Sequence, residues 1–367
     1  MKIGQIFMRI GVMRGRLKTL IAGSLLGTLA ACGHKQSFPE ASCTRVNVTS
    51  NGNPVIGVED MAYDAQSRTL YLSAYDRRGH NKGGIYRLNI NYTDTDLIAT
   101  TIMENIRPHG IELTRDGQKL MLDFIDRQGP QENKKPVIRN LSWNDDLPDN
   151  ISEAPPIIED KLCASNDLTR SIDGVIFVTQ DHKSCTSQDQ KRENILSPKQ
   201  ASVSLIYQED GALKLINHLS GLSFANGVAL SAKAELLYVA ETRRKQIVVS
   251  APDYLENFPI KLAGGPDNLT RHADNIYAAL IPSLIKFSRF QKNKQRRIKS
   301  RFAIISPTYP SKEKPSERPA TFNVSTYDVP ASVISGATVA LKAGDHIWLG
   351  AAYDTAIARC TLPEIAP

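Results

Sequence analysis

The amino-acid sequence predicts an all-β protein, a single six-bladed β-propeller whose ring is closed by its N- and C-terminal segments. Two observations predict this fold: short β-rich runs alternate with turn residues, and six similar segments follow one another at the spacing of propeller blades. Because one blade alone cannot bury both of its faces, the six units must close into a ring. A pair of β-sandwiches is the alternative architecture, but it does not account for six repeats of one pattern.

Each repeated unit consists of one or two polar residues, a short apolar strand, a turn and a longer apolar strand. The fourth unit illustrates the pattern with Asn226-Gly-Val-Ala-Leu-Ser-Ala-Lys-Ala-Glu-Leu-Leu-Tyr-Val-Ala240. A third strand is expected after some units, as at 84–89 and 246–250. The six units begin at Glu59, His109, Asn166, Asn226, Asp267 and Gly336.

The N-terminus has the features of an export signal. Residues 1–31 contain five basic residues and no acid, and an apolar run ends in Leu29-Ala-Ala-Cys32. This ending resembles the lipobox of bacterial lipoproteins, which implies cleavage before Cys32 and a lipid on that residue; plain secretion is the alternative. We therefore expect a signal at 1–31, a lipidated tether at 32–45 and one propeller domain at 46–362. The expected location is the bacterial cell envelope, facing the periplasm, with the lipid in the outer membrane.

The net charge is explained largely by this signal. The whole chain has 45 basic and 38 acidic residues, a formal charge of +7 and a pI of about 9.0. Without the five basic residues of 1–31, 40 basic residues face the 38 acids. A nucleic-acid partner is therefore not expected, although a basic pI alone would suggest one. One basic segment remains at 286–301, and we expect a solvated loop or hairpin there, between the fifth and sixth blades.

Five cysteines are present, and lipidation of Cys32 would leave four. An oxidising compartment favours two disulfides, for which four cysteines allow three connectivities. A bond between Cys43 and Cys360 would tie the two ends of the propeller together and leave Cys163 to pair with Cys185. No zinc-type spacing of Cys and His is present.

The polar residues that open the units carry the chemical signal. In a propeller the inner strands line a central channel, so equivalent positions of successive blades converge on its axis. Carboxylate and carboxamide oxygens suit Ca²⁺, whereas one imidazole and no thiolate argue against zinc or copper. Each position taken alone could instead be a turn residue. The converging positions are Glu59, Asp60, His109, Asn166, Asp167, Asn226, Asp267 and Asn268.

The ordered set of these motifs resembles the paraoxonase/arylesterase family of calcium-dependent six-bladed propellers, relatives of the gluconolactonases. The match extends from Cys43 to Cys360 through Val58-Glu-Asp60, Arg107-Pro-His-Gly-Ile111, Ser165-Asn-Asp167, Phe224-Ala-Asn-Gly227, Pro266-Asp-Asn268 and Ser335-Gly-Ala-Thr338. The resemblance implies two calcium ions. The first, catalytic ion would be held by Glu59, Asn166, Asn226, Asp267 and Asn268. The second, structural ion would be held by Asp60, Asp167 and the backbone carbonyl of Ile111.

This resemblance implies a carboxylic ester hydrolase acting on a small lactone or aryl ester. The calcium ion would polarise the carbonyl, and His109 is the candidate general base for the attacking water. His182 is a weaker candidate. Paraoxonases have a second histidine beside the first, whereas 123–127 here contains none; Asp126 is a hypothetical substitute that would orient the imidazole. The sequence contains no G-x-S-x-G, H-E-x-x-H, P-loop or G-x-G-x-x-G motif.

A different class of function is compatible with the same residues. In this alternative the protein is a non-catalytic propeller, stabilised by Ca²⁺, that binds a small ligand or a protein partner. The missing second histidine and the unusual segment 286–319 favour it. The natural substrate and the oligomeric state are not encoded in any motif that we find.

Overall fold

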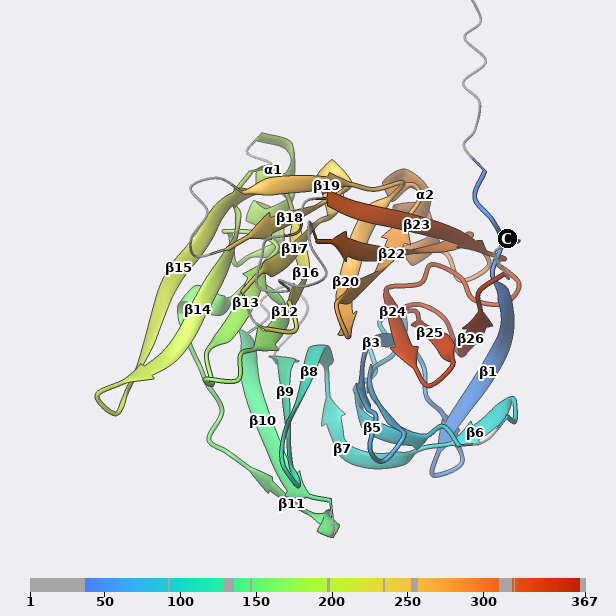
Figure 1. The fold of residues 1–367 in the computed structure, drawn as a ribbon, viewed down its shortest axis with the longest axis horizontal. Coiled ribbons are helices and arrows are strands. Elements are labelled where there is room, and N and C mark those ends of the chain that lie inside the picture. The colour runs from blue at the N-terminus through green and yellow to red at the C-terminus, as the bar shows by residue number, and fades with distance from the viewer. Residues whose placement is uncertain are drawn as a thin grey trace, which may run out of the picture. The chain divides into compact units, whose positions relative to one another are not determined.

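Six four-stranded units surround a central axis in the computed structural model of the protein, which confirms the predicted six-bladed propeller (Figure 1). The structure describes residues 37–91, 93–128, 135–145, 147–196, 199–233, 235–251, 257–309, 319 and 321–363. The signal segment and Cys32 lie outside these residues. Among the described residues, no helix has the length and apolar character needed to span a membrane.

The first three blades are antiparallel sheets whose strands follow one another along the chain, except that β6 is left out of blade one and pairs with β1. Blade one contains β3 (Val58–Asp64), β4 (Thr69–Ala74), β5 (Gly83–Asn89) and β7 (Thr100–Ile106). Blade two contains β8 (Pro108–Asp116), β9 (Lys119–Gln128), β10 (Lys135–Asn144) and β11 (Leu147–Glu153). After the short helix η1 (Asp160–Leu162), blade three contains β12 (Ser165–Arg170), β13 (Ile176–Gln180), β14 (Ala201–Glu209) and β15 (Ala212–Leu222).

The next two blades follow the same order. Blade four contains β16 (Ala225–Leu230), β17 (Leu237–Glu241), the turn η2 (Thr242–Arg244), β18 (Gln246–Ser250) and β19 (Phe258–Lys261). Blade five contains β20 (Gly265–His272), β21 (Asn275–Ile281), β22 (Ser300–Thr308) and β23 (Thr321–Val329). The third strands expected at 84–89 and 246–250 are therefore present as β5 and β18.

Blade six joins the two ends of the chain, as predicted. From the channel outward, its strands are β24 (Val339–Ala343), β25 (His346–Gly350), β26 (Ile357–Thr361) and β1 (Ser42–Ser50). Strand β1 also pairs with β2 (Asn53–Pro54) and β6 (Asp96–Ile98). Strand β1 pairs with β26 from Ser42 onward. The propeller sheet thus begins at Ser42, within the predicted tether 32–45.

Both predicted disulfides are present. Cys43 and Cys360 are direct partners in the β1–β26 ladder, so their bond joins the first and last strands of the ring. Cys163 bonds to Cys185, which lies in the loop that follows β13. The first bond spans 317 residues of sequence and the second spans 22.

The hydrophobic core is divided among the interfaces between neighbouring blades. Among the described residues, buried apolar side chains form six clusters of this kind and a seventh under α2 (Leu284–Gln291). Fully buried Trp348, for example, belongs to the cluster between blades six and one, and Phe124 to the cluster between blades one and two. Each blade is therefore stabilised by contacts with both neighbours, and the ring depends on its closure.

Two helices lie in connections that follow the second strand of a blade, and the sequence did not predict them. Helix α1 (Ser187–Leu196) follows β13 and has no buried residue. Helix α2 follows β21, so the basic segment 286–301 lies within blade five rather than between blades five and six. The first residues of the segment 286–301 belong to α2 and do not form the predicted solvated loop or hairpin, because Phe287 and Phe290 are buried against Tyr353.

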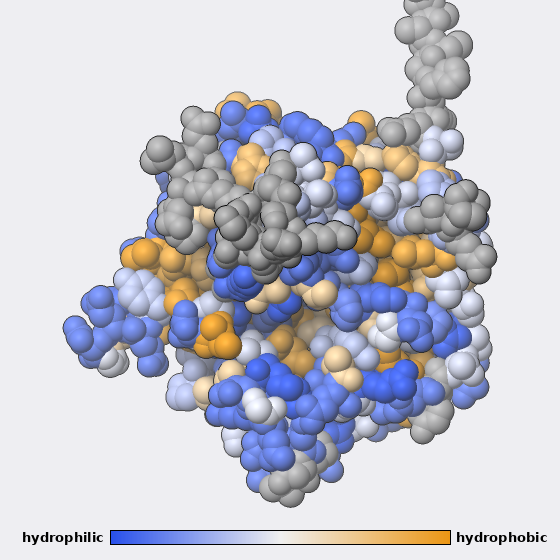
Figure 2. Space-filling model, viewed as in Figure 1, coloured by the Kyte–Doolittle hydropathy of each residue, from blue (hydrophilic) through white to orange (hydrophobic). Residues whose placement is uncertain are grey.

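The outer strands extend beyond this core. The β14–β15 hairpin projects from the ring in Figure 1, and its tip is hydrophilic in the space-filling view of Figure 2. Most residues of β15 are solvent-exposed, and they provide control positions for the tests below.

Removal of the Cys43–Cys360 bond is expected to destabilise the propeller more than removal of the Cys163–Cys185 bond. The double substitution Cys43→Ser/Cys360→Ser should lower the free energy of unfolding by about 2–5 kcal/mol, because the bond closes the longer loop. Urea denaturation of this variant and of Cys163→Ser/Cys185→Ser measures the difference. Equal or greater destabilisation by the second pair would contradict the closing role of the first.

Candidate metal centre

The residues predicted to face the axis lie in β-bulges at the start of the inner strands. In five blades the pairing of the first strand with the second shifts register there. A bulge leaves residues unpaired in the ladder and redirects their side chains, so adjacent residues can serve one site. β24 of blade six shows no such shift. The intervals of the shifts contain Glu59, His109-Gly110, Asn166-Asp167, Asn226-Gly227 and Asp267-Asn268.

Four of the five residues predicted to hold the first calcium ion are connected in pairs. The Asn268 amide donates to Glu59 Oε1 at 2.9 Å, and the Asn226 amide donates to Asp267 Oδ1 at 2.5 Å. The fifth residue, Asn166, donates instead to Asp181 Oδ2 at 3.0 Å. All five side chains are buried.

The carbonyl oxygens of the three asparagines are buried and have no hydrogen-bond partner. In each side chain the amide nitrogen donates to a carboxylate, so the amide cannot be reversed without placing its oxygen against that carboxylate. A buried acceptor without a partner costs about 1–3 kcal/mol. A hard cation that accepts amide and carboxylate oxygens as ligands would remove this cost, so these residues fit Ca²⁺.

The charges of the centre also fit a cation. Burial raises the pKa of Asp267 well above its usual value, and the charge of Glu59 raises it further. Burial opposes ionisation of Glu59 as well, but His109 and Arg77 outweigh this effect and lower its pKa to about 2. A divalent cation between these carboxylates would reduce their repulsion.

The centre does not depend on acids and imidazoles alone. Within the described part of the chain, no three His, Cys, Asp or Glu side chains form a metal-binding group by themselves. The candidate set differs because three of its five members are asparagines. Amide oxygens are neutral hard ligands, typical of calcium rather than of zinc.

The residues predicted to hold the second ion lie deeper along the inner strands. Asp60 accepts the backbone N–H groups of Met61 and Ile111, each at 2.8 Å. Asp167 accepts those of Leu168 and Val228, also at 2.8 Å. Each carboxylate thus joins its own inner strand to that of the next blade.

Ionisation of these two aspartates is unfavourable. Burial raises the pKa of Asp60 well above its usual value, and Asp167 and Glu59 raise it further. Burial likewise raises the pKa of Asp167. The chain also comes close at this point, since a Cβ on Gly110 would lie 2.3 Å from Asp167 Oδ1. The glycine after His109 therefore permits blades two and three to meet beside Asp167.

Hydroxyl groups that sequence reasoning missed connect each of four blades to the next. Ser73 Oγ donates to the carbonyl of His109 at 2.5 Å, and Thr179 Oγ1 donates to that of Asn226 at 2.5 Å. Thr242 Oγ1 donates to the carbonyl of Pro266 at 2.7 Å, and Thr338 Oγ1 donates to that of Glu59 at 2.8 Å. These bonds fix the backbone of the bulges. The recurrence of Ser or Thr near this edge was the only sequence signal for them.

The candidate base His109 is buried beside Glu59. Its Nδ1 lies 2.8 Å from Glu59 Oε2 and 3.2 Å from the Arg77 guanidinium, which sequence reasoning did not identify. Burial lowers the pKa of His109, and Arg127 lowers it further; Glu59 opposes them, with a result of about 4. The imidazole is therefore neutral at pH 7.

Asp126 does not have the orienting role that we hypothesised. Its Oδ1 accepts the backbone N–H of Arg107 at 3.0 Å, and its Oδ2 lies 3.2 Å from Arg139. Asp126 pairs with Pro108 in the β8–β9 ladder, so its side chain serves the edge of blade two. Glu59 and Arg77 contact the imidazole in its place.

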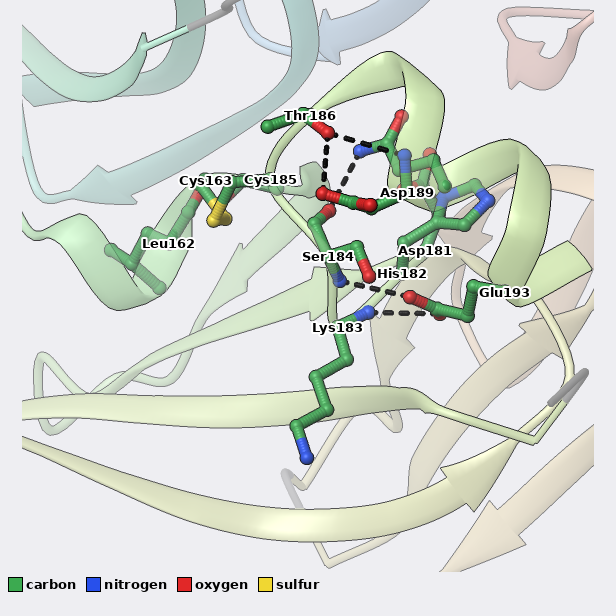
Figure 3. Close-up of a disulfide and its surroundings, with 12 residues drawn as sticks. Leu162, Cys163, Asp181, His182, Lys183, Ser184, Cys185, Thr186, Asp189 and Glu193 are labelled. Carbon is green, nitrogen blue, oxygen red and sulfur yellow. Dashed lines mark hydrogen bonds and ion pairs between the residues drawn. A yellow bond between two sulfur atoms is a disulfide. The ribbon is translucent and has the colours of Figure 1, made fainter.

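His182, the weaker candidate base, has both ring nitrogens engaged by the protein. Its Nδ1 lies 2.7 Å from Asp181 Oδ1 and its Nε2 lies 2.8 Å from Asn194 Oδ1 in α1. Figure 3 shows its loop between the Cys163–Cys185 disulfide and Glu193, which accepts two backbone N–H groups. His182 therefore supports Asp181, the partner of Asn166, and holds the helix.

The fold and the site together define the class of this protein. It is a six-bladed propeller with buried carboxylate and amide oxygens at the start of its inner strands. The family model described as Arylesterase matches residues 80–362. This chain belongs to the arylesterase family, which confirms the resemblance stated above. Family membership supports a hydrolase of esters or lactones.

Solved structures agree with the fold. The chain is similar to a luciferin-regenerating enzyme (15% identity, TM-score 0.53, covering 88% of this chain and 95% of that one). It is also similar to regucalcin, a calcium-binding protein from Agrobacterium tumefaciens (12%, 0.50, 89% and 95%). A gluconolactonase from Xanthomonas campestris is comparable (14%, 0.50, 89% and 98%). No curated protein matches the chain.

Replacement of a connecting hydroxyl should loosen the centre without removing any predicted ligand. Thr179→Val leaves the Asn226 carbonyl and the Asp167 N–H without their partner and should cost about 1–3 kcal/mol of stability. Thermal or urea unfolding measures the loss. Thr100→Val, at an exposed position of β7, is the control and should change stability by no more than about 0.5 kcal/mol. Equal effects would contradict the connecting role.

Proposed function

We propose that this protein is a calcium-dependent hydrolase of small lactones or aryl esters. The observation that carries the proposal is the group of three buried amide oxygens without a protein partner, beside two buried carboxylates. Glu59, Asn166, Asn226, Asp267 and Asn268 would hold the first ion. Asp60, Asp167 and the Ile111 carbonyl would hold the second, which would stabilise the ring. Membership of the arylesterase family supports the reaction class.

When bound, Ca²⁺ would polarise the ester or lactone carbonyl and stabilise the oxyanion that forms on it. The protein's own residues prepare the proton transfer. Glu59 Oε2, 2.8 Å from His109 Nδ1, would accept a proton held on that nitrogen, whereas the Arg77 guanidinium, 3.2 Å from the same nitrogen, can only donate to it. The proposed mechanism requires the tautomer in which Nδ1 carries the proton and pairs with Glu59. Nε2 then has a free lone pair and can accept a proton from water. Arg77 and Tyr75, whose ring the Arg77 guanidinium covers at 4.0 Å, enclose this group.

The alternative is a non-catalytic propeller that uses Ca²⁺ for stability and binds a small ligand or a protein partner. The observation in its favour is the environment of His109, which lacks the second histidine of paraoxonases and has an acid and an arginine instead. The two functions predict different results on chelation. A catalytic ion is needed for turnover, whereas a purely structural ion is needed only for stability.

We also propose that the mature protein is a lipoprotein of the bacterial cell envelope, with Cys32 as its lipidated first residue. The basic start, the apolar run and Leu29-Ala-Ala-Cys32 support this proposal. Cys32→Ser should move the protein from the membrane fraction to the aqueous fraction, or leave the signal uncleaved. Unchanged membrane fractionation with a cleaved signal would contradict lipid attachment.

Metal removal should abolish turnover and lower thermal stability together. Metal analysis of the mature protein should find two Ca²⁺ per chain, and EDTA should remove activity against lactones and aryl esters. Glu59→Gln and Asn268→Ala should each lower kcat/KM by about 100-fold or more, as expected when charge stabilisation is lost. Asn217→Ala, at an exposed position of β15, is the matched control. EDTA-insensitive turnover would contradict the mechanism. Stability loss without any activity would support the alternative.

Removal of the candidate base should affect catalysis while leaving the metal content unchanged. His109→Gln should lower kcat by about 100- to 10,000-fold. Because the pKa of His109 is held at about 4, the basic form persists from pH 7 to pH 5, and activity should fall only as the pH approaches 4. Stopped-assay pH profiles of both proteins test this. Full activity of the variant would place the base elsewhere.

A further inference from the structure

A cavity of 580 Å³ lies at the opposite end of the channel from the candidate metal centre. The centre occupies the beginnings of the inner strands, whereas the cavity is lined by residues from the middle of these strands to the turns that follow them. At its inner end the cavity reaches Ile111, whose carbonyl is a proposed ligand of the second ion. Inner strands from all six blades contribute to it. The proposed hydrolysis makes no use of this space.

The lining of the cavity is predominantly cationic. Its positively charged residues are Arg115, Arg170, Lys233, Arg271 and Lys342. Among the described residues that line it, Glu112 is the one acid. A cavity opening that is lined by cations and surrounded by protein of low dielectric constant raises the local concentration of anions.

Two of these cationic side chains form ion pairs with carboxylates of the protein. Arg115 forms ion pairs with Asp64 at 2.6 Å and with Asp145. Arg170 pairs with Asp123 at 2.5 Å, and this carboxylate is fully buried. These guanidinium groups therefore have carboxylate partners already and are poor candidates for holding a ligand.

Arg271 and Lys342 differ from them in this respect. Neither forms an ion pair with a carboxylate among the residues described here, and the one side-chain hydrogen bond of Arg271 goes to the Ala273 carbonyl at 3.3 Å. They lie on adjacent inner strands, β20 and β24, which Thr270 joins by donating to the Ala340 carbonyl at 2.7 Å. Burial lowers the pKa of His272, and the charges of Lys342 and Arg271 lower it further, so both cations lie near one imidazole.

We propose that this end of the channel binds a small oxyanion, a carboxylate or a phosphate, between Arg271 and Lys342. Glu112 is the one acidic side chain of the lining that Arg271 influences, and it forms no ion pair with Arg271 or Lys342 among the described residues. An oxyanion would therefore add countercharge between the two cations, and the planar guanidinium suits both chemistries. The cavity has the volume of a small-molecule site. Arg271 is exposed at the mouth and Lys342 is half-buried behind it, so a ligand can enter from solution. Arg271 and Lys342 are not among the proposed metal ligands, and the site does not require the hydrolase function.

Isothermal titration calorimetry of the mature protein at low ionic strength tests this site, with inorganic phosphate and with succinate as probes. Binding should weaken by about ten-fold or more in Arg271→Gln/Lys342→Gln, because two charge-assisted hydrogen bonds are lost. Lys191→Gln/Lys214→Gln removes the same charge from exposed positions and should bind as the wild type does. Lys342→Gln alone gives a second readout if the double variant does not fold. Binding of only one probe would identify the chemistry of the oxyanion.

The opposite results would overturn the site. No binding of either probe by the wild-type protein would do so, as would equal affinities in the two double variants. Phosphate could instead bind at the candidate metal centre. Binding that survives in Arg271→Gln/Lys342→Gln but disappears in Glu59→Gln would show this, and would reject the channel-end site while leaving the hydrolase proposal intact.

Discussion

The structure depends on a group of buried polar residues whose hydrogen-bonding groups find only some of their partners within the protein. Bulges at the start of four inner strands contain the carboxylates and amides of this group, and the bulge of a fifth contains His109. There Asp60, Asp167 and Asp267 are buried with raised pKa values, and three asparagine oxygens have no partner. Burial of this kind is unfavourable without a countercharge. The surrounding propeller must therefore hold the group in place against that cost.

Contacts between blades, rather than contacts within any single blade, offset this free-energy cost. Apolar clusters fill the interfaces, the Cys43–Cys360 bond closes the first and last strands, and hydroxyls such as Thr179 and Thr338 fix the bulged backbone of the next blade. Asp60 accepts a backbone N–H across the interface between blades one and two, and Asp167 accepts one across the interface between blades three and four. Residues of the polar centre thus also hold the blades together. The same aspartate side chains thus belong to the polar centre and link neighbouring blades.

The two ends of the channel differ in charge. Carboxylates and amide oxygens gather where the inner strands begin, and arginines and lysines gather where they end. Because all six inner strands run in the same direction, a difference between the beginning and the end of each strand is summed around the ring. The nearly balanced charge of the chain without its signal segment therefore does not reveal how the acidic and basic side chains are distributed between the two ends of the channel.

The sequence by itself determined the repeat number, the phase of the polar residues, both disulfides and the family. These are readable because strand periodicity is local, and because equivalent positions such as Asn166 and Asn226 must converge once six units close. Tertiary structure alone decided the neighbours of those residues. Arg77 beside His109, and Phe287 and Phe290 of a helical basic segment against Tyr353, depend on which strands and loops closure brings together. Contacts of this kind join residues tens of positions apart, and no local pattern in the chain encodes them.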